Sequence, residues 1–192
     1  MRITLKTALK VHKPCKDGQL VNQADNAAFG DVGLSYRFRS ALRLNSTLGS
    51  MKPTVYIETS VISYLTARRS NDVRALASQS VTLEWWEVQR PNFELFISEF
   101  VVSEAGLGHP EAAQRRLTAL EGIAELRSSP AVDALSLALI QRNALPANAE
   151  MDAFHVAIAA VNGIEYLLTW NCTHIANALT RPKIEATCRA WI

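Results

Sequence analysis

The sequence predicts an α/β fold in which helices cover both faces of a parallel sheet. Short runs of β-branched and aromatic residues recur along the chain, and longer segments of helical periodicity separate them. Gly, Pro and Asn stand at the junctions between these segments. Alternation of strand and helix is typical of a parallel sheet, because parallel strands need a crossover between them. The chain has 192 residues, 48% of them apolar, which is enough to bury a core.

The first predicted strand runs directly into a helix. Residues 54–57 are β-branched and aromatic, as is typical of strands. The polar residues Glu58, Thr59 and Ser60 follow, and side chains of this kind cap a helix, which we expect to begin near Val61. The first acidic residue of this region therefore stands at a strand–helix junction.

The other strands are also short, and helices separate them. Pro91 ends one helix because it lacks the amide hydrogen that a helix needs, and Asn162 and Gly163 end another. The strands are expected at residues 93–97, 124–126 and 166–169. The helices are expected at residues 72–90, 98–104, 110–120, 130–143 and 149–161.

The chain divides at Met51 into two parts of unlike charge. Residues 1–50 hold eight Lys and Arg against three Asp, a net charge of +5, whereas residues 51–192 hold twelve against fifteen acidic residues, a net charge of −3. We expect residues 1–50 to be a basic, poorly ordered leader or a misassigned extension, with strand-like alternation only at 33–44. A basic arm that contacts nucleic acid is the alternative.

Composition also bears on location. No run approaches the ~18 consecutive apolar residues of a membrane helix, so we expect no membrane segment. The three cysteines, Cys15, Cys172 and Cys188, are an odd number without CxxC spacing. This pattern supports neither a disulfide framework nor a zinc knuckle, and a reducing cytoplasm fits it best.

Polar residues stand where the predicted strands and helices begin and end. Glu58 ends the first strand, and Glu104 lies on the helix after the second. Asp152 stands in the first turn of the helix before the fourth strand, and Asn171 follows that strand. Each has a structural explanation when it is taken alone, as a cap, a solvated helix position or a turn residue. Because ligands bind beyond the carboxyl ends of parallel strands, we expect all four to meet at one edge.

A divalent metal ion is the partner that these carboxylates predict together. Glu104 and Asp152 stand in apolar sequence without a neighbouring Lys or Arg, and partly buried carboxylates need a counter-charge. Oxygen donors suit Mg²⁺ or Mn²⁺ rather than Zn²⁺. We expect His155 to pack between helix and sheet, since no second helical His accompanies it. Carboxylates with Mg²⁺ fit phosphodiester hydrolysis, in which the ion activates water and neutralises phosphoryl charge.

Four segments occur in the order of the PIN-domain motifs. They read YIETSVISYL (56–65), ISEFVVSE (97–104), MDAFHVAIA (151–159) and YLLTWN (166–171). On these segments the chain from Met51 onward resembles the VapC-like toxins, the ribonuclease halves of bacterial toxin–antitoxin pairs. The resemblance implies a three-layer α/β/α fold with a central parallel sheet of four or five short strands. It also implies a Mg²⁺- or Mn²⁺-dependent endoribonuclease that cuts single-stranded RNA.

The resemblance assigns roles to individual residues. Glu58, Glu104 and Asp152 correspond to metal-binding carboxylates, and Asn171 corresponds to a fourth, more variable catalytic position. Thr59 and Ser60 look like the polar neighbours that position phosphate or water. A homodimer and a cognate antitoxin, whose peptide covers the active site, are further implications of the resemblance.

The acidic domain needs local positive charge to hold RNA. Arg68 and Arg69 follow the helix that leaves Glu58, and we expect them to line the rim of the site and to contact phosphates. The arginines at 115–116 and the basic residues at 181–183 read equally well as solvated surface.

Two other functions compete with the ribonuclease. One is a catalytically weak or inactive PIN-fold module that binds RNA or a partner protein. It is favoured by Glu58 and Asn171, which stand where relatives more often have Asp. The other is a carboxylate-dependent phosphatase or DNA nuclease, since the same ligands would serve either reaction.

Overall fold

Four parallel strands form the centre of the sheet. The computed structural model describes residues 6–8, 35–37 and 52–191. In order across the sheet, the parallel strands are β6 (Tyr166–Leu168), β3 (Thr54–Ile57), β4 (Glu94–Ser98) and β5 (Ala124–Leu126). Each neighbouring pair is parallel. The parallel sheet of short strands predicted from the sequence is therefore confirmed.

Two short antiparallel strands extend the sheet beyond β6. The strand β2 (Ser35–Arg37) pairs with β6, and β1 (Lys6–Ala8) pairs with β2. The strand β2 falls within the stretch at 33–44 whose alternation is strand-like. The rest of the segment predicted to be a leader lies outside the described residues, and its character stays a prediction.

The central strands are buried on both faces. Val55, Tyr56 and Ile57 of β3 and Leu167 of β6 have no exposed surface. Continuous burial of this kind is typical of parallel strands that are covered by helices on both sides. The hydrophobic core is therefore centred on β3 and β6.

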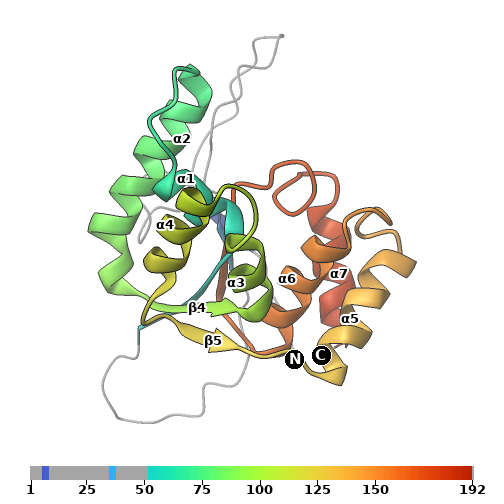
Figure 1. Ribbon diagram of the computed structural model, residues 1–192. Coiled ribbons are helices and arrows are strands. Elements are labelled where there is room, and N and C mark those ends of the chain that lie inside the picture. Colours follow the sequence, from blue (N-terminus) through green and yellow to red (C-terminus); the bar gives the residue numbers. More distant parts are fainter. Residues whose placement is uncertain (1–5, 9–34, 38–51, 192) are drawn as a thin grey trace, which may run out of the picture.

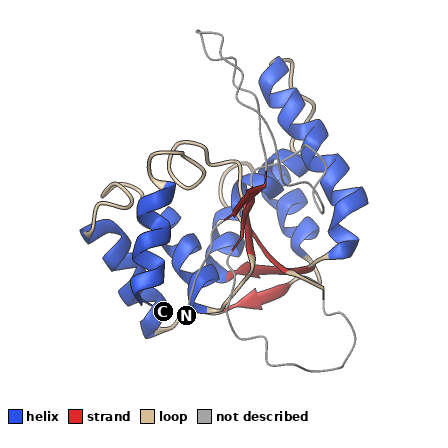
Figure 2. Ribbon diagram, turned by 180° about the vertical axis from the view of Figure 1, so that it is seen from behind, coloured by secondary structure: helices blue, strands red, loops and turns tan. Residues whose placement is uncertain are grey.

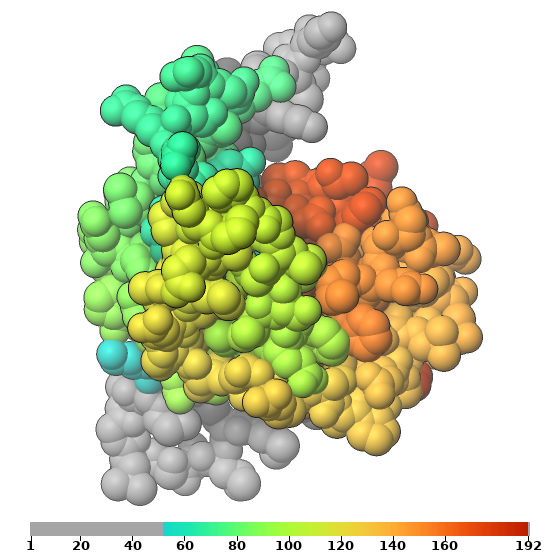
Figure 3. Space-filling model, in the orientation of Figure 1, coloured from blue at the N-terminus to red at the C-terminus, as the bar shows by residue number. Residues whose placement is uncertain are grey.

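Two groups of helices cover the sheet (Figures 1 and 2). The first group contains α1 (Thr59–Thr66), α2 (Val73–Glu84), α3 (Glu99–Ala105) and α4 (Pro110–Leu120). The second contains α5 (Pro130–Gln141), α6 (Glu150–Val161) and α7 (Arg181–Trp191). Helix α1 contacts α2, α3 and α4, and α5 contacts α6 and α7. In the space-filling view, α3 and α4 lie in the middle of the face turned to the reader, between the green region of α1 and α2 and the orange region of α5 and α6 (Figure 3). The three-layer arrangement is as predicted.

The segment predicted as one helix over 72–90 is α-helical only in its first part. Asp72 caps α2 by accepting a hydrogen bond from the amide of Ala75 at 2.8 Å. After Glu84 the chain continues as a π-helical turn, η1 (Trp85–Gln89), and a 3-10 turn, η2 (Arg90–Asn92). The predicted stop at Pro91 thus falls inside η2. Among the described residues, no helix has the length and apolar character needed to cross a membrane.

Candidate active site

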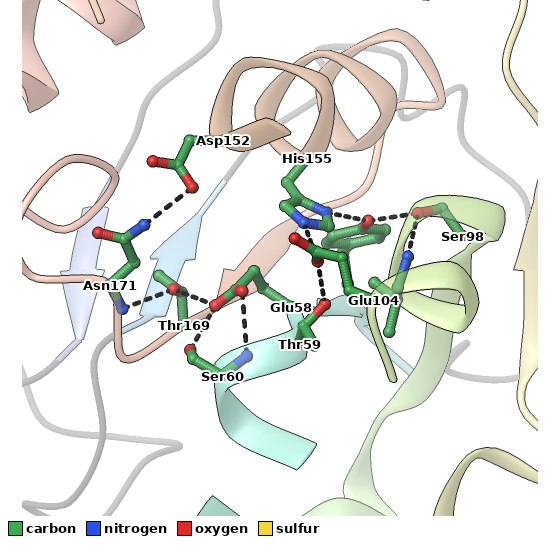
Figure 4. A network of polar contacts seen from close by, with 11 residues as sticks. Glu58, Thr59, Ser60, Ser98, Glu104, Asp152, His155, Thr169 and Asn171 are labelled. Atoms are coloured by element: carbon green, nitrogen blue, oxygen red, sulfur yellow. Dashed lines mark hydrogen bonds and ion pairs between the residues drawn. The ribbon is translucent and has the colours of Figure 1, made fainter. Parts of the chain in front are cut away.

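The candidate site lies at the carboxyl ends of the parallel strands. Glu58 follows β3 and Thr169 follows β6, while Ser98 is the last residue of β4. Helix α3 begins at this edge after β4, and α6 carries its N-terminal turn to the same place. Figure 4 shows the polar side chains that these elements and the first turn of α1 bring together. The edge predicted from strand order is therefore where the polar residues meet.

Glu58 is a buried carboxylate that protein donors hold in one position. It is the N-cap of α1, and its side chain is 6% exposed. The Ser60 amide donates to Oε1 at 3.0 Å, and the Thr169 hydroxyl donates to Oε2 at 2.6 Å. The Ser60 hydroxyl also donates to Oε2. These three hydrogen bonds fix the direction of the Glu58 side chain, and they engage the hydroxyl of Ser60 within the protein.

Glu104 accepts hydrogen bonds from two other elements. Its Oε2 atom receives the Thr59 hydroxyl and lies 2.9 Å from Nε2 of His155. Burial acts to raise the pKa of Glu104, but the hydrogen bond and charge of His155, together with the Thr59 hydroxyl, hold the pKa below its usual value. Glu104 is therefore a carboxylate anion at neutral pH.

Buried polar groups form a chain of hydrogen bonds that ends at Nδ1 of His155. The phenol of Tyr56 lies 2.7 Å from Nδ1 of His155 and 2.6 Å from Oγ of Ser98. Burial raises the pKa of Tyr56, so the phenol keeps its hydrogen. Ser98 also caps α3 by accepting the Val101 amide at 3.4 Å. This chain of hydrogen bonds therefore joins β4, β3, α6 and α3.

Asp152 has its own partners in the loop that follows β6. Asn171 donates through Nδ2 to Oδ1 at 2.9 Å, and Nδ1 of His174 lies 2.7 Å from Oδ2. The Asn171 amide donates to Oγ1 of Thr169 at 2.9 Å. Because Thr169 in turn donates to Glu58, hydrogen bonds connect Asp152 to Glu58 through Asn171 and Thr169.

Three of these side chains form a group that could hold a metal ion. Glu58, Glu104 and His155 each offer one ligand atom, and these atoms all lie within 4.8 Å of one another. The structure thus brings together two of the three predicted carboxylates. Asp152 is not a member of this group and reaches it only through the hydrogen bonds described above.

The donor set fits a divalent cation. Within residues 52–191, no Lys or Arg forms an ion pair with Glu58, Glu104 or Asp152. Oε1 of Glu104 accepts no hydrogen bond from the described residues. Carboxylate oxygens that keep free lone pairs suit Mg²⁺ or Mn²⁺. The residues present therefore form a group that could hold a divalent cation, and the choice of Mg²⁺ or Mn²⁺ stays a prediction.

The arginines expected at the rim lie at the far end of α1. Arg68 and Arg69 follow the eight residues of this helix, which carry the chain about 12 Å along its axis. The Arg68 side chain is 83% exposed and lies 3.3 Å from Oε2 of Glu111. The structure therefore does not bring these two arginines into the polar network around Glu58.

Several site residues carry no individual signal in the sequence. Ser98 and Thr169 resemble ordinary cap and turn residues. His155 is buried between helix and sheet, as expected, but it also contacts Glu104. Its position three residues after Asp152, which places both on one side of α6, was the only available indication.

The chain is similar to known proteins at the level of structure and not at the level of sequence. No protein-family model matches the sequence, and the search of curated proteins finds no match. The structure is similar to the crystal structure of VapC20 from Mycobacterium tuberculosis, a toxin that cleaves the sarcin–ricin loop. The match covers 58% of this chain and 85% of VapC20, with 17% sequence identity and a TM-score of 0.45. We therefore assign function from the side chains of the site.

Proposed function

We propose that the chain is a Mg²⁺- or Mn²⁺-dependent single-strand endoribonuclease of the PIN-domain, VapC-like type. One observation carries the proposal: Glu58 and Glu104, from different elements, place carboxylate oxygens within 4.8 Å of each other. Within residues 52–191 no Lys or Arg forms an ion pair with either carboxylate, and partly buried carboxylates need a counter-charge. A shared divalent ion meets this need and supplies hydrolytic chemistry.

The protein residues would divide the work between holding the ion and orienting its ligands. Glu58, Glu104 and Asp152 are the proposed ligands, and Asn171 keeps the fourth catalytic position. When bound, the ion supplies an activated water and neutralises charge on the phosphate. Ser60 and Thr169 orient Glu58, and Thr59 orients Glu104, through the hydrogen bonds described above. In this scheme Thr59 and Ser60 orient the carboxylates through hydrogen bonds. The carboxylates would in turn hold the ion against which the reacting phosphate is positioned.

Substrate, partners and location belong to the same proposal. The substrate is single-stranded RNA, and a cognate antitoxin protein would cover the site. Arg68 and Arg69 would contact phosphates of an RNA strand away from the catalytic centre, since their guanidinium groups are charged and exposed. The proposed protein is a homodimer and lies in the cytoplasm.

The experiment that tests the proposal compares Asp152→Asn with Asp133→Asn. Both aspartates lie in the first turn of a helix, α6 and α5 respectively, but only Asp152 belongs to the polar network. With single-stranded RNA and Mn²⁺, Asp152→Asn should lose activity by roughly 10–100-fold, since it weakens ion binding. Asp133→Asn should cut as well as the unmodified protein.

Parallel substrates separate the competing functions. Single-stranded RNA, DNA and a phosphate ester are assayed side by side with Mg²⁺, Mn²⁺ or EDTA. Cleavage of RNA alone, abolished by EDTA, is the expected result. Preference for DNA or for the ester would replace the ribonuclease by a DNA nuclease or a phosphatase. Absence of all cleavage together with RNA binding would favour the non-catalytic module.

A further inference from the structure

His155 is a polar residue in an apolar part of α6. Its side chain is 1% exposed, and the neighbouring residues Val156, Ala157 and Ile158 belong to the core. A histidine that served only to fill space would lose hydration without replacing it, which is costly in a buried position. Here both ring nitrogens have partners, Tyr56 at Nδ1 and Glu104 at Nε2. The hydrogen bonds therefore explain the residue better than packing does.

The direction of these hydrogen bonds follows from the partners. An ionised carboxylate only accepts, so Nε2 of His155 carries the hydrogen that points at Glu104. In a neutral ring Nδ1 then accepts from the phenol of Tyr56, and Ser98 donates its hydroxyl hydrogen to Tyr56. In a charged ring Nδ1 donates to Tyr56 instead. In both cases the hydrogen on Nε2 stays directed at Glu104.

The arrangement restricts Glu104 from one side. Oε2 is held by His155 and Thr59, whereas Oε1 accepts nothing from the described residues. His155 in turn cannot turn freely, because Tyr56 holds its other nitrogen and Ser98 holds Tyr56 (Figure 4). One oxygen of the carboxylate is thus fixed by the protein, and the other is left for a ligand.

We infer that His155 is a positioning residue that orients Glu104 toward a divalent cation and does not itself bind the cation. This inference rests on the proposed function, because it concerns the same metal site. To become a ligand, His155 would have to give up its hydrogen bond to Glu104 or to Tyr56. Histidine and carboxylate pairs of this kind commonly orient metal ligands, and their loss weakens metal affinity 10–100-fold.

The test measures Mn²⁺ affinity by calorimetric titration, without RNA. His155→Leu fills the buried position with an apolar side chain and removes the donor, and we expect the dissociation constant for Mn²⁺ to rise roughly 10–100-fold. His155→Gln places an amide donor where Nε2 lies, and its affinity should stay within about threefold of the unmodified protein. Tyr56→Phe removes the hydrogen bond to Nδ1 of His155 and should raise the dissociation constant for Mn²⁺ by a smaller factor.

Ser136→Ala is the matched control. Ser136 is also buried, and its hydroxyl donates to the carbonyl of Asp133 at 2.8 Å, within α5. Loss of this hydrogen bond is expected to lower thermal stability and to leave Mn²⁺ affinity unchanged. Far-ultraviolet circular dichroism shows that each variant is folded before the titration.

Electron spin echo spectroscopy of Mn²⁺ bound to the unmodified protein tests the second half of the inference. If His155 does not bind the ion, replacing it should not change the coupling between Mn²⁺ and nearby nitrogen nuclei. We therefore expect the same coupling in the spectra of the unmodified protein and of His155→Gln. A coupling from a directly bound imidazole nitrogen that disappears in His155→Gln would overturn the inference. Equal Mn²⁺ affinity in His155→Leu and the unmodified protein would overturn it as well, while leaving the proposed function intact. If the unmodified protein binds no Mn²⁺, both fail.

Discussion

Thr169→Val isolates the hydrogen bonds that hold Glu58 at the site. The Thr169 side chain is 1% exposed, and its hydroxyl donates to Glu58 at 2.6 Å and accepts the Asn171 amide at 2.9 Å. A hydrogen bond to a charged group contributes about 1.5–3 kcal/mol, and a neutral one about 0.5–1.5 kcal/mol. Valine has nearly the same shape, so these two losses dominate. We expect the free energy of unfolding to fall by about 2–4.5 kcal/mol.

Urea denaturation in the absence of added metal measures this loss. In thermal denaturation, 1 kcal/mol corresponds to about 2–4 °C for a chain of this size, so Tm should fall by roughly 4–18 °C. Thr169→Ser is the control, because it keeps the hydroxyl and removes one methyl group, worth about 0.8 kcal/mol. The reasoning is refuted if Thr169→Val lies within about 0.5 kcal/mol of the unmodified protein, or if serine is as harmful as valine.

Two further predictions concern pH and the core. Because the pKa of Glu104 is lowered in the folded protein, the ionised carboxylate contributes stability that is complete above its usual pKa of 4.5 and is lost as pH falls through the lowered value. Glu104→Gln should therefore show a weaker loss of unfolding free energy below this pH, and parallel curves for the two proteins would contradict the shift. Leu167→Ala, at a fully buried position of β6, should cost about 2–5 kcal/mol in urea denaturation; a cost below 1 kcal/mol would mean that this part of the core collapses onto the cavity.

Local sequence patterns were sufficient to predict most of the fold. The strands at 54–57 and 124–126 and the helix at 110–120 have the predicted bounds, because each combines a clear composition with a Pro, Gly or polar cap at its ends. The end of the helix at 72–90 could not be predicted, since its apolar periodicity continues through η1 and η2, where the winding changes and Trp85 packs against Phe93 at a ring distance of 5.9 Å.

The sequence was sufficient to predict the edge of the sheet at which the site lies, but not which side chains contact one another there. Strand order brings Glu58 and Glu104 to the same place. However, the third member of their group is His155, and Asp152 is engaged by Asn171 and His174. These pairings depend on side-chain directions across four elements, which spacing along the chain does not determine. Arg68 and Arg69 illustrate the same limit, because α1 carries them away from the carboxylate that precedes it.

Thermal unfolding with and without Mn²⁺, in the unmodified protein and in Glu104→Gln, tests most directly whether Glu58 and Glu104 share a divalent cation. A cation that binds only the folded state stabilises it by about 2.7 kcal/mol at a concentration 100 times Kd, which corresponds to a rise in Tm of roughly 5–11 °C. We predict this rise for the unmodified protein, its reversal by EDTA, and its loss in Glu104→Gln. An unmodified protein whose Tm does not respond to Mn²⁺, or a variant that responds equally, would contradict the shared site.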